Sequence, residues 1–228
     1  MARSGEEART ALLDAAERLF ALQGVETASL RDVSLAAGQR NNSAVQYHFG
    51  DREGLVAAVF TRRMDAINEM RRAMISDLDR TNRGDDVTGL AAALMVPLIE
   101  YVTSHDGWYG RFLVRTQFDH FAQTVKNALP VSVPVIEIVR RLVALLPELE
   151  PRARQIRVEQ MMTHYIGAVA NWEWARDRGE RRMSPADLRD DVLATSVGIL
   201  RAPARMQFEF TLKEKPCPVV SMSPMSTL

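Results

Sequence analysis

The chain has 228 residues, 46% of them hydrophobic and 25% charged, which is enough for one large domain or two small ones with a real apolar core. Its formal net charge at pH 7 is zero, and arginines and acidic residues are equally numerous over residues 1–63, which excludes a strongly basic protein that holds nucleic acid by charge alone. A run of about 18 apolar residues and a secretory leader are both missing, and Cys217 is the only cysteine, so we expect no membrane span, no intrachain disulfide and a cytoplasmic location.

The first 50 residues predict three helices. Apolar residues recur at three- and four-residue steps over 5–22, Ser29 can cap a helix that ends before Gly38, and a short helix follows over about 42–48. Two short helices across a glycine-containing turn are the arrangement by which proteins place a helix in the DNA major groove. The sequence therefore predicts an all-α chain that begins with a helix-turn-helix domain.

A helical wheel divides the third of these helices into two faces. Apolar and aromatic side chains gather on one face together with His48, while Ser43, Gln46 and Tyr47 lie on the other, with Arg40 close by. Asn and Gln can bridge adenine, Arg can bind guanine, and Ser and Tyr can reach phosphate oxygens. The polar face therefore either reads DNA or is an ordinary solvated surface.

Beyond residue 50 the chain predicts long helices. One runs from Asp51 to about residue 80 and spans roughly 45 Å, long enough to join two domains. Five more are expected over about 86–104, 108–128, 133–147, 152–178 and 185–201, which makes about nine in all. A tail over 204–228 follows, and its residues 206–212 alternate between apolar and polar as a strand would.

Residues 9–60 resemble the N-terminal domain of the tetracycline-repressor (TetR) family. The likeness rests on ALLDAAERLFALQGVETASLRDVSLAAG followed by AVQYHFGDREGLVAAVF, in which the Ala37-Gly38 pair and the Tyr47-His48-Phe49 triplet keep nearly the family's spacing. The segment from Gly38 to His48 is one residue longer than usual, and Arg52 stands where Lys is commoner.

The resemblance implies a homodimeric, ligand-responsive regulator, most simply a repressor, that binds a pseudo-palindromic DNA operator and is released by a small, largely apolar effector. It divides the chain into a DNA-binding domain over 1–50 and a helical ligand-binding and dimerisation domain over 51–203. His48 is equally consistent with a buried core histidine. The residues expected to contact bases or phosphates are Ser29, Arg31, Arg40, Asn41, Asn42, Ser43, Gln46, Tyr47, His48 and Arg52.

The same resemblance places an effector pocket among the middle helices and a dimer interface on the last two. Methionine and aromatic side chains suit an adaptable apolar pocket, although such stripes also occur in ordinary cores. The expected pocket residues are Met64, Ile67, Met70, Tyr101, Trp108, Phe112, Arg115 and Phe118. The expected interface residues, which could instead face the core of one chain, are Met161, Met162, Tyr165, Val169, Trp172, Leu188, Val192, Thr195, Ser196 and Ile199.

Enzymatic motifs are missing from the sequence. Its four histidines lack the spacing of metal ligands, and no glycine-rich phosphate loop, nucleophile elbow or paired cysteine motif occurs. We therefore expect no enzyme, no cofactor and no metal. The alternative function is a helical module that binds a small molecule or a protein without binding DNA.

Overall fold

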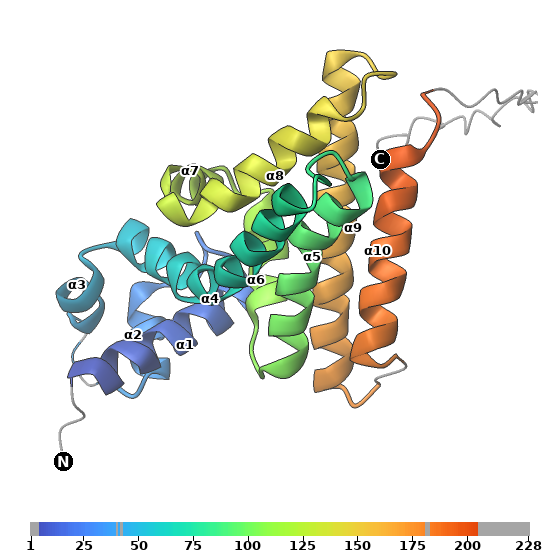
Figure 1. The fold of residues 1–228 in the computed structure, drawn as a ribbon. Helices are drawn as coiled ribbons and strands as arrows, with labels where there is room; N and C mark the ends of the chain where they lie inside the picture. The colour runs from blue at the N-terminus through green and yellow to red at the C-terminus, as the bar shows by residue number, and fades with distance from the viewer. Residues whose placement is uncertain (1–4, 40, 42, 181–182, 205–228) are drawn as a thin grey trace, which may run out of the picture.

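The structure, a computed structural model, describes residues 5–39, 41, 43–180 and 183–204. Within these ranges the fold is all-α, as predicted, with ten α-helices, one short 3-10 helix and no strand (Figure 1). The alternating segment predicted at 206–212 lies outside the described residues. The helices are α1 (Gly5–Gln23), α2 (Leu30–Ala36), α3 (Ala44–Phe49), α4 (Arg52–Arg80), α5 (Val87–Ser104), α6 (Tyr109–Gln117), α7 (His120–Ala128), η1 (Pro130–Ser132), α8 (Val133–Ala144), α9 (Pro151–Asp177) and α10 (Pro185–Arg201).

The tenth helix arises because the segment predicted as one helix over 108–128 is two. Phe118 lies between them with a backbone that leaves the helical region, and Asp119 starts a new helix by accepting a hydrogen bond of 2.9 Å from the Ala122 amide. Asp is a common N-cap residue, because its side chain can accept a hydrogen bond from an unpaired amide of the first helical turn. The chain direction can therefore change between α6 and α7.

The N-terminal bundle consists of α1, α2 and α3, gathered at one side of the molecule and closed by the first turns of α4 (Figure 1). Its core is built from fully buried side chains of all four helices, Leu12, Phe20, Val33, Val45 and Leu55. Gly38 turns the chain between α2 and α3 with a φ of 70°, a left-handed conformation that glycine adopts without strain. The packing of α2 on α1 and of α3 on α4 thus sets the orientation of α3.

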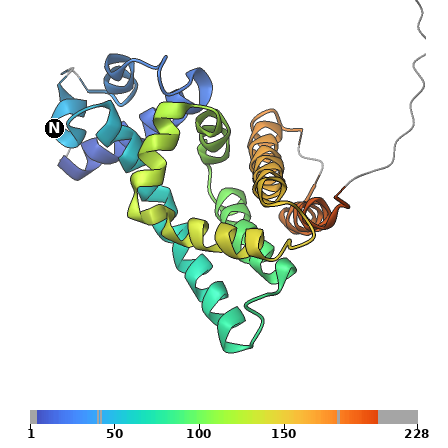
Figure 2. The same cartoon turned by 90° about the horizontal axis from the view of Figure 1, so that it is seen from above.

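The C-terminal bundle consists of α4 to α10 and is organised around α5, which packs against α4, α8, α9 and α10. By length and composition alone, α5 is apolar enough to cross a membrane, although polar residues including Glu100 interrupt its apolar run. Its side chains from Leu90 to Ile99 are mostly inaccessible within the bundle, which accounts for their apolar character. Figure 2 shows α9 and α10 side by side on the side of the molecule away from α2 and α3.

Candidate nucleic-acid interface and sensor cavity

The predicted two faces of α3 are confirmed. Val45 is buried, and Ala44, His48 and Phe49 are half-buried on the side of α3 that faces the protein. Ser43 and Gln46 are exposed, and 83% of the Tyr47 surface is accessible. The polar face of α3 is therefore free to meet a partner outside the chain.

The segment before α3 is held by its own polar groups. The Asn41 carboxamide oxygen accepts a hydrogen bond of 3.0 Å from the Ser43 amide, which leaves the Ser43 hydroxyl without a capping role. Arg40 and Asn42 lie outside the described residues. Asn41 thus shapes the backbone at the start of α3, while Ser43 and Gln46 present unused polar atoms.

Two expected phosphate contacts lie at the start of α2. The Ser29 hydroxyl accepts a hydrogen bond of 3.0 Å from the Asp32 amide and caps the helix, as predicted. Its own O–H remains available to donate. Arg31 follows in the first turn and is exposed, so both residues lie at the start of the helix that packs against α3.

Arg52, for which a phosphate contact is expected, makes two hydrogen bonds within the chain. Its Nη1 donates to the carbonyl oxygens of Val25 and Ala28, the second at 2.8 Å, and so fastens the α1–α2 turn to α4. At the same helix start the Asp51 carboxylate accepts from the Gly54 amide at 2.8 Å. A side chain at Gly54 would collide with the Phe49 carbonyl, since a Cβ there would lie 2.0 Å from its oxygen. This end of α4 is therefore built for close packing and carries a carboxylate that repels phosphate.

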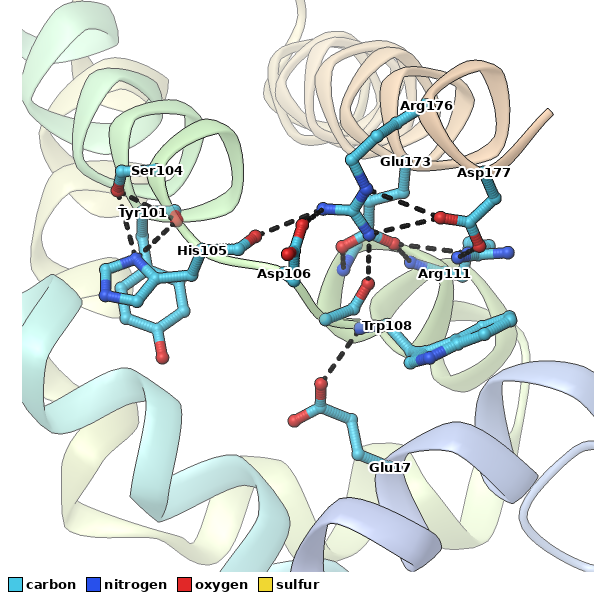
Figure 3. A network of polar contacts seen from close by, with 12 residues as sticks. Glu17, Tyr101, Ser104, His105, Asp106, Trp108, Arg111, Glu173, Arg176 and Asp177 are labelled. Atoms are coloured by element: carbon cyan, nitrogen blue, oxygen red, sulfur yellow. Dashed lines mark hydrogen bonds and ion pairs between the residues drawn. The ribbon is translucent and has the colours of Figure 1, made fainter. Parts of the chain in front are cut away.

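A buried polar network, the interbundle joint, connects the N-terminal bundle to the C-terminal one (Figure 3). Glu17 of α1 is 2% exposed. It accepts 3.0 Å and 2.7 Å hydrogen bonds from the Trp108 amide and from Arg63 Nε. Arg63 also donates to the Tyr101 hydroxyl at 2.9 Å. One carboxylate of α1 thus holds α4, α5 and the start of α6 together.

On the far side of the joint, Glu173 of α9 caps α6 (Figure 3). Its two carboxylate oxygens accept hydrogen bonds of 2.8 Å and 2.9 Å from the amides of Gly110 and Arg111. Burial raises the pKa of the Glu173 carboxyl above its usual value, although both amides favour the charged form. Arg176 donates to the Gly107 carbonyl at 2.8 Å and so ties the same loop to α9. The start of α6 is therefore clamped between α1 and α9.

Three residues expected in the effector pocket belong to this joint or to its border instead. The Tyr101 hydroxyl accepts from Arg63, and the Arg111 guanidinium lies 3.6 Å from the centre of the Trp108 ring. Arg115 is exposed and donates to the carbonyl oxygens of Ala21 and Leu22, both at 3.3 Å. The sequence shows that Tyr101, Trp108 and Arg115 lie close together along the chain. It does not show that they take part in the contacts between the C-terminal bundle and α1.

A cavity of about 510 Å³ lies among α4, α6, α7, α8 and α9. Of the predicted pocket residues, Met64 and Phe118 line this cavity, whereas Ile67 and Phe112 are fully buried in the core and Met70 is exposed on α4. The lining also includes residues that the prediction missed, among them Lys126, Val135, Val139 and Ile166. The middle helices therefore do enclose a cavity, but with α7 and α8 supplying much of its wall.

The predicted interface stripe on α9 and α10 needs a correction. Met162, Thr195 and Ile199 keep accessible surface, and Met162 and Tyr165 line the cavity. The others are covered by their own chain, because the stripe faces α5, α6 and the neighbouring helix, and leave little surface for a partner: Met161, Tyr165, Val169, Trp172, Leu188, Val192 and Ser196. The exposed sides of the two helices carry other residues, including Gly167 and Trp174 on α9 and Ala194 and Gly198 on α10.

Metal-binding geometry does not occur in the part of the chain that the structure describes, where no three His, Cys, Asp or Glu side chains are grouped to hold an ion. The features that remain are an exposed polar helix, a buried joint and a cavity. Together they form a connected path, since α6 borders the cavity and its first residues lie in the joint.

Comparison with known proteins places these features in context. Residues 12–59 match the family model described as bacterial regulatory proteins, tetR family. Over most of its length the chain is similar to a tetR family transcription regulator from Shewanella sp. PV-4, with a TM-score of 0.56, 18% identity and coverage of 85% of this chain and 96% of that chain. It is also similar to NalD of Pseudomonas aeruginosa, described as the secondary repressor of the MexAB-OprM multidrug efflux pump, with a TM-score of 0.50, 19% identity and coverage of 86% and 97%. These likenesses show the fold. No curated protein sequence matches the chain.

Proposed function

We propose that the chain, whose residues 12–59 match the model of the tetR family of bacterial regulatory proteins and whose fold is similar to that of tetR family transcription regulators, is a ligand-responsive, dimeric repressor. The observation that carries the proposal is the exposed polar face of α3, where no hydrogen bond with another described residue engages the side chains of Ser43, Gln46 and Tyr47. Such a face has the donors and acceptors that base edges and phosphates require. The repressor is cytoplasmic and has no enzymatic activity.

We assign base contacts to Gln46 and Ser43 and phosphate contacts to Tyr47, Ser29 and Arg31. In a symmetric dimer, two copies of α3 enter successive major grooves about 34–36 Å apart. Arg52 contributes indirectly, because it holds the α1–α2 turn against α4 and thereby orients α2 and α3 on the DNA.

The proposed dimer uses the exposed sides of α9 and α10. Gly167 and Gly198 lie there with open space where a side chain would begin, and small residues allow helices of two chains to approach closely. Trp174, of which 50% is exposed, lies on the same side of α9 as Gly167. The proposed interface thus uses the two helices that the sequence predicts, α9 and α10, but the sides of these helices that face away from the core of the chain.

The proposed signal passes from the cavity to α3 through the interbundle joint. A ligand that binds better when α6 is displaced pulls on Trp108 and therefore on Glu17 of α1. Because binding is linked, DNA weakens the ligand by the same factor as the ligand weakens DNA. Release from DNA then needs no contact between the ligand and α3.

The alternative is a helical module that binds a small molecule but no DNA, and it is supported by the zero net charge. Selection of bound duplexes from a random pool distinguishes the two. The repressor yields a two-fold symmetric site whose half-sites are centred about one helical turn apart. Recovery of unrelated sequences in the proportions of the starting pool would reject DNA recognition and leave the alternative.

A further inference from the structure

The lining of the 510 Å³ cavity holds two charged side chains, Lys126 and Glu159, which differ in their exposure to water. Lys126 of α7 is its lysine, and no hydrogen bond or ion pair engages the Lys126 ammonium within the described residues. Burial lowers the pKa of this ammonium from its ordinary value. A desolvated cation is costly unless an anion or several acceptors compensate it. The described part of the chain supplies no such anion for Lys126, so a bound ligand could supply it.

A second cation lies behind the cavity wall. Arg71 of α4 is fully buried and donates to the Leu94 carbonyl at 3.0 Å and 3.2 Å and to the Asn68 carboxamide oxygen at 3.0 Å. It also contacts Met64 Sδ at 3.2 Å and the Tyr165 hydroxyl, and both of those residues line the cavity. All of these acceptors are neutral. The positive charge of Arg71 is therefore uncompensated by any carboxylate in the described part of the chain.

The acidic side chain that lines the cavity is Glu159, and it lies toward solvent. Glu159 is exposed and accepts a hydrogen bond of 3.1 Å from Gln155, which is exposed as well. Charges near water are screened more strongly than buried ones. The positive charges of Lys126 and of Arg71, which contacts Tyr165, are therefore less screened than the negative charge of Glu159.

The rest of the lining selects a mainly apolar body. Val135, Val139, Met162 and Ile166 come from α8 and α9, and the volume falls in the range of about 300–1,000 Å³ that is usual for small-molecule pockets. The open cleft of about 730 Å³ beside the joint has a different character, because acidic and basic side chains line it together and most pair with one another. The mainly apolar cavity, in which Lys126 has no hydrogen bond or ion pair with the described residues, is thus the better site for an organic ligand.

We propose that this cavity binds a small amphipathic organic anion, whose carboxylate lies at Lys126 and whose hydrocarbon body lies against α8 and α9. That this anion is also the effector rests on the proposed function. The carboxylate supplies the anion that Lys126 lacks, and it is attracted further by Arg71. A neutral molecule of the same shape gains only the apolar contacts, and a cationic one is repelled.

Titration calorimetry with three probes of equal chain length, decanoate, 1-decanol and decylammonium, tests the proposal on the full chain without DNA. We expect decanoate to bind at least about tenfold more tightly than decanol, the size of one charge-assisted hydrogen bond, and decylammonium to bind most weakly. Equal affinity for decanoate and decanol would overturn the proposal, and this comparison needs no variant.

Lys126→Met keeps the length of the side chain and removes its charge. The variant should lose about tenfold in decanoate affinity and keep its affinity for decanol. Arg140→Met is the matched control, because Arg140 is an exposed cation of α8 outside the cavity lining. An equal loss in both variants, or none in Lys126→Met, would refute the role of Lys126.

Adding DNA separates this inference from the proposed function. If the protein binds decanoate at Lys126 but does not bind DNA, the anion site is supported and the proposed repressor function is rejected. A protein that recognises an operator but binds decanoate no better than decanol keeps the repressor and loses the anion site.

Discussion

The carboxylate of Glu17 in α1 accepts a hydrogen bond of 3.0 Å from the main-chain amide of Trp108, the residue that precedes α6 (Figure 3). The two residues are 91 positions apart in sequence, and both carboxylate oxygens are used, since Arg63 of α4 binds the other. A displacement of the start of α6 must therefore move α1 or break this bond. This contact makes the N-terminal bundle sensitive to the C-terminal one.

Glu17→Gln should destabilise the protein, because the substitution removes the nearer and buried one of the two carboxylates that pair with the half-buried Arg63 guanidinium, and leaves Asp14 at 3.6 Å. We expect a loss of about 1–3 kcal/mol in the free energy of unfolding, measured by urea denaturation. Asp14→Asn is the matched control on the same helix, since its exposed carboxylate pairs with Arg62 and more distantly with Arg63, and each of these exposed pairs should contribute less than about 1 kcal/mol. Equal losses in the two variants would show that Glu17 is not the main link.

Gln46→Ala should reduce the discrimination between operator and random DNA, because Gln46 is assigned to bases. Loss of a bidentate base contact costs about 1–3 kcal/mol of discrimination. Tyr47→Phe should instead weaken all sequences alike, since its hydroxyl is assigned to phosphate. Fluorescence anisotropy titrations of each variant with an operator duplex and with a random duplex measure the ratio of the two affinities. An unchanged ratio for Gln46→Ala would remove that residue from the base-reading set.

Gly198→Glu should convert the dimer to monomers without harming the fold of one chain. A side chain at Gly198 enters open space, and replacing a helical glycine removes a helix penalty of about 1 kcal/mol. In a dimer packed through this side of α10, the same carboxylate would be forced into the partner. Analytical ultracentrifugation decides between these cases. A dimer that survives both Gly198→Glu and Gly167→Glu would place the interface elsewhere.

Acid should weaken the attachment of α8 to α4. The Arg141 guanidinium donates to the Asp79 carboxylate and holds the pKa of Asp79 below its ordinary value of 3.8. Because the folded pKa is the lower one, the stabilisation is complete above about pH 4 and disappears as the pH falls through the folded value. The difference in urea midpoint between the natural chain and Asp79→Asn should therefore shrink on acidification. A difference that is the same at pH 7 and at pH 2 would contradict the assignment.

The sequence predicts the orientation of α3 because helical periodicity alone decides which of its side chains share a face. It also locates helix starts such as that of α10, where Ser184 and Asp187 form the capping box. It does not say what covers a buried stripe, and for this reason Trp172 was expected at a dimer interface but lies in the core of its own chain.

Long-range contacts escape sequence reasoning altogether. In the sequence, Glu17 is indistinguishable from an exposed acidic residue of a helix. Only the fold shows that it contacts Trp108. Lys126 gives a weak signal, since it is the only lysine among residues 1–212, but nothing in the sequence shows that it lines a cavity. The break at Asp119 could have been found from its capping preference, and it is this break that moves α7 to the wall of the cavity.

The central claim, that the exposed polar face of α3 recognises a DNA sequence, is tested most directly by equilibrium titration of the full chain onto a selected duplex and onto a scrambled duplex of the same base composition. At physiological ionic strength the selected duplex should bind at least about a thousandfold more tightly. Equal affinity for the two duplexes would contradict the account.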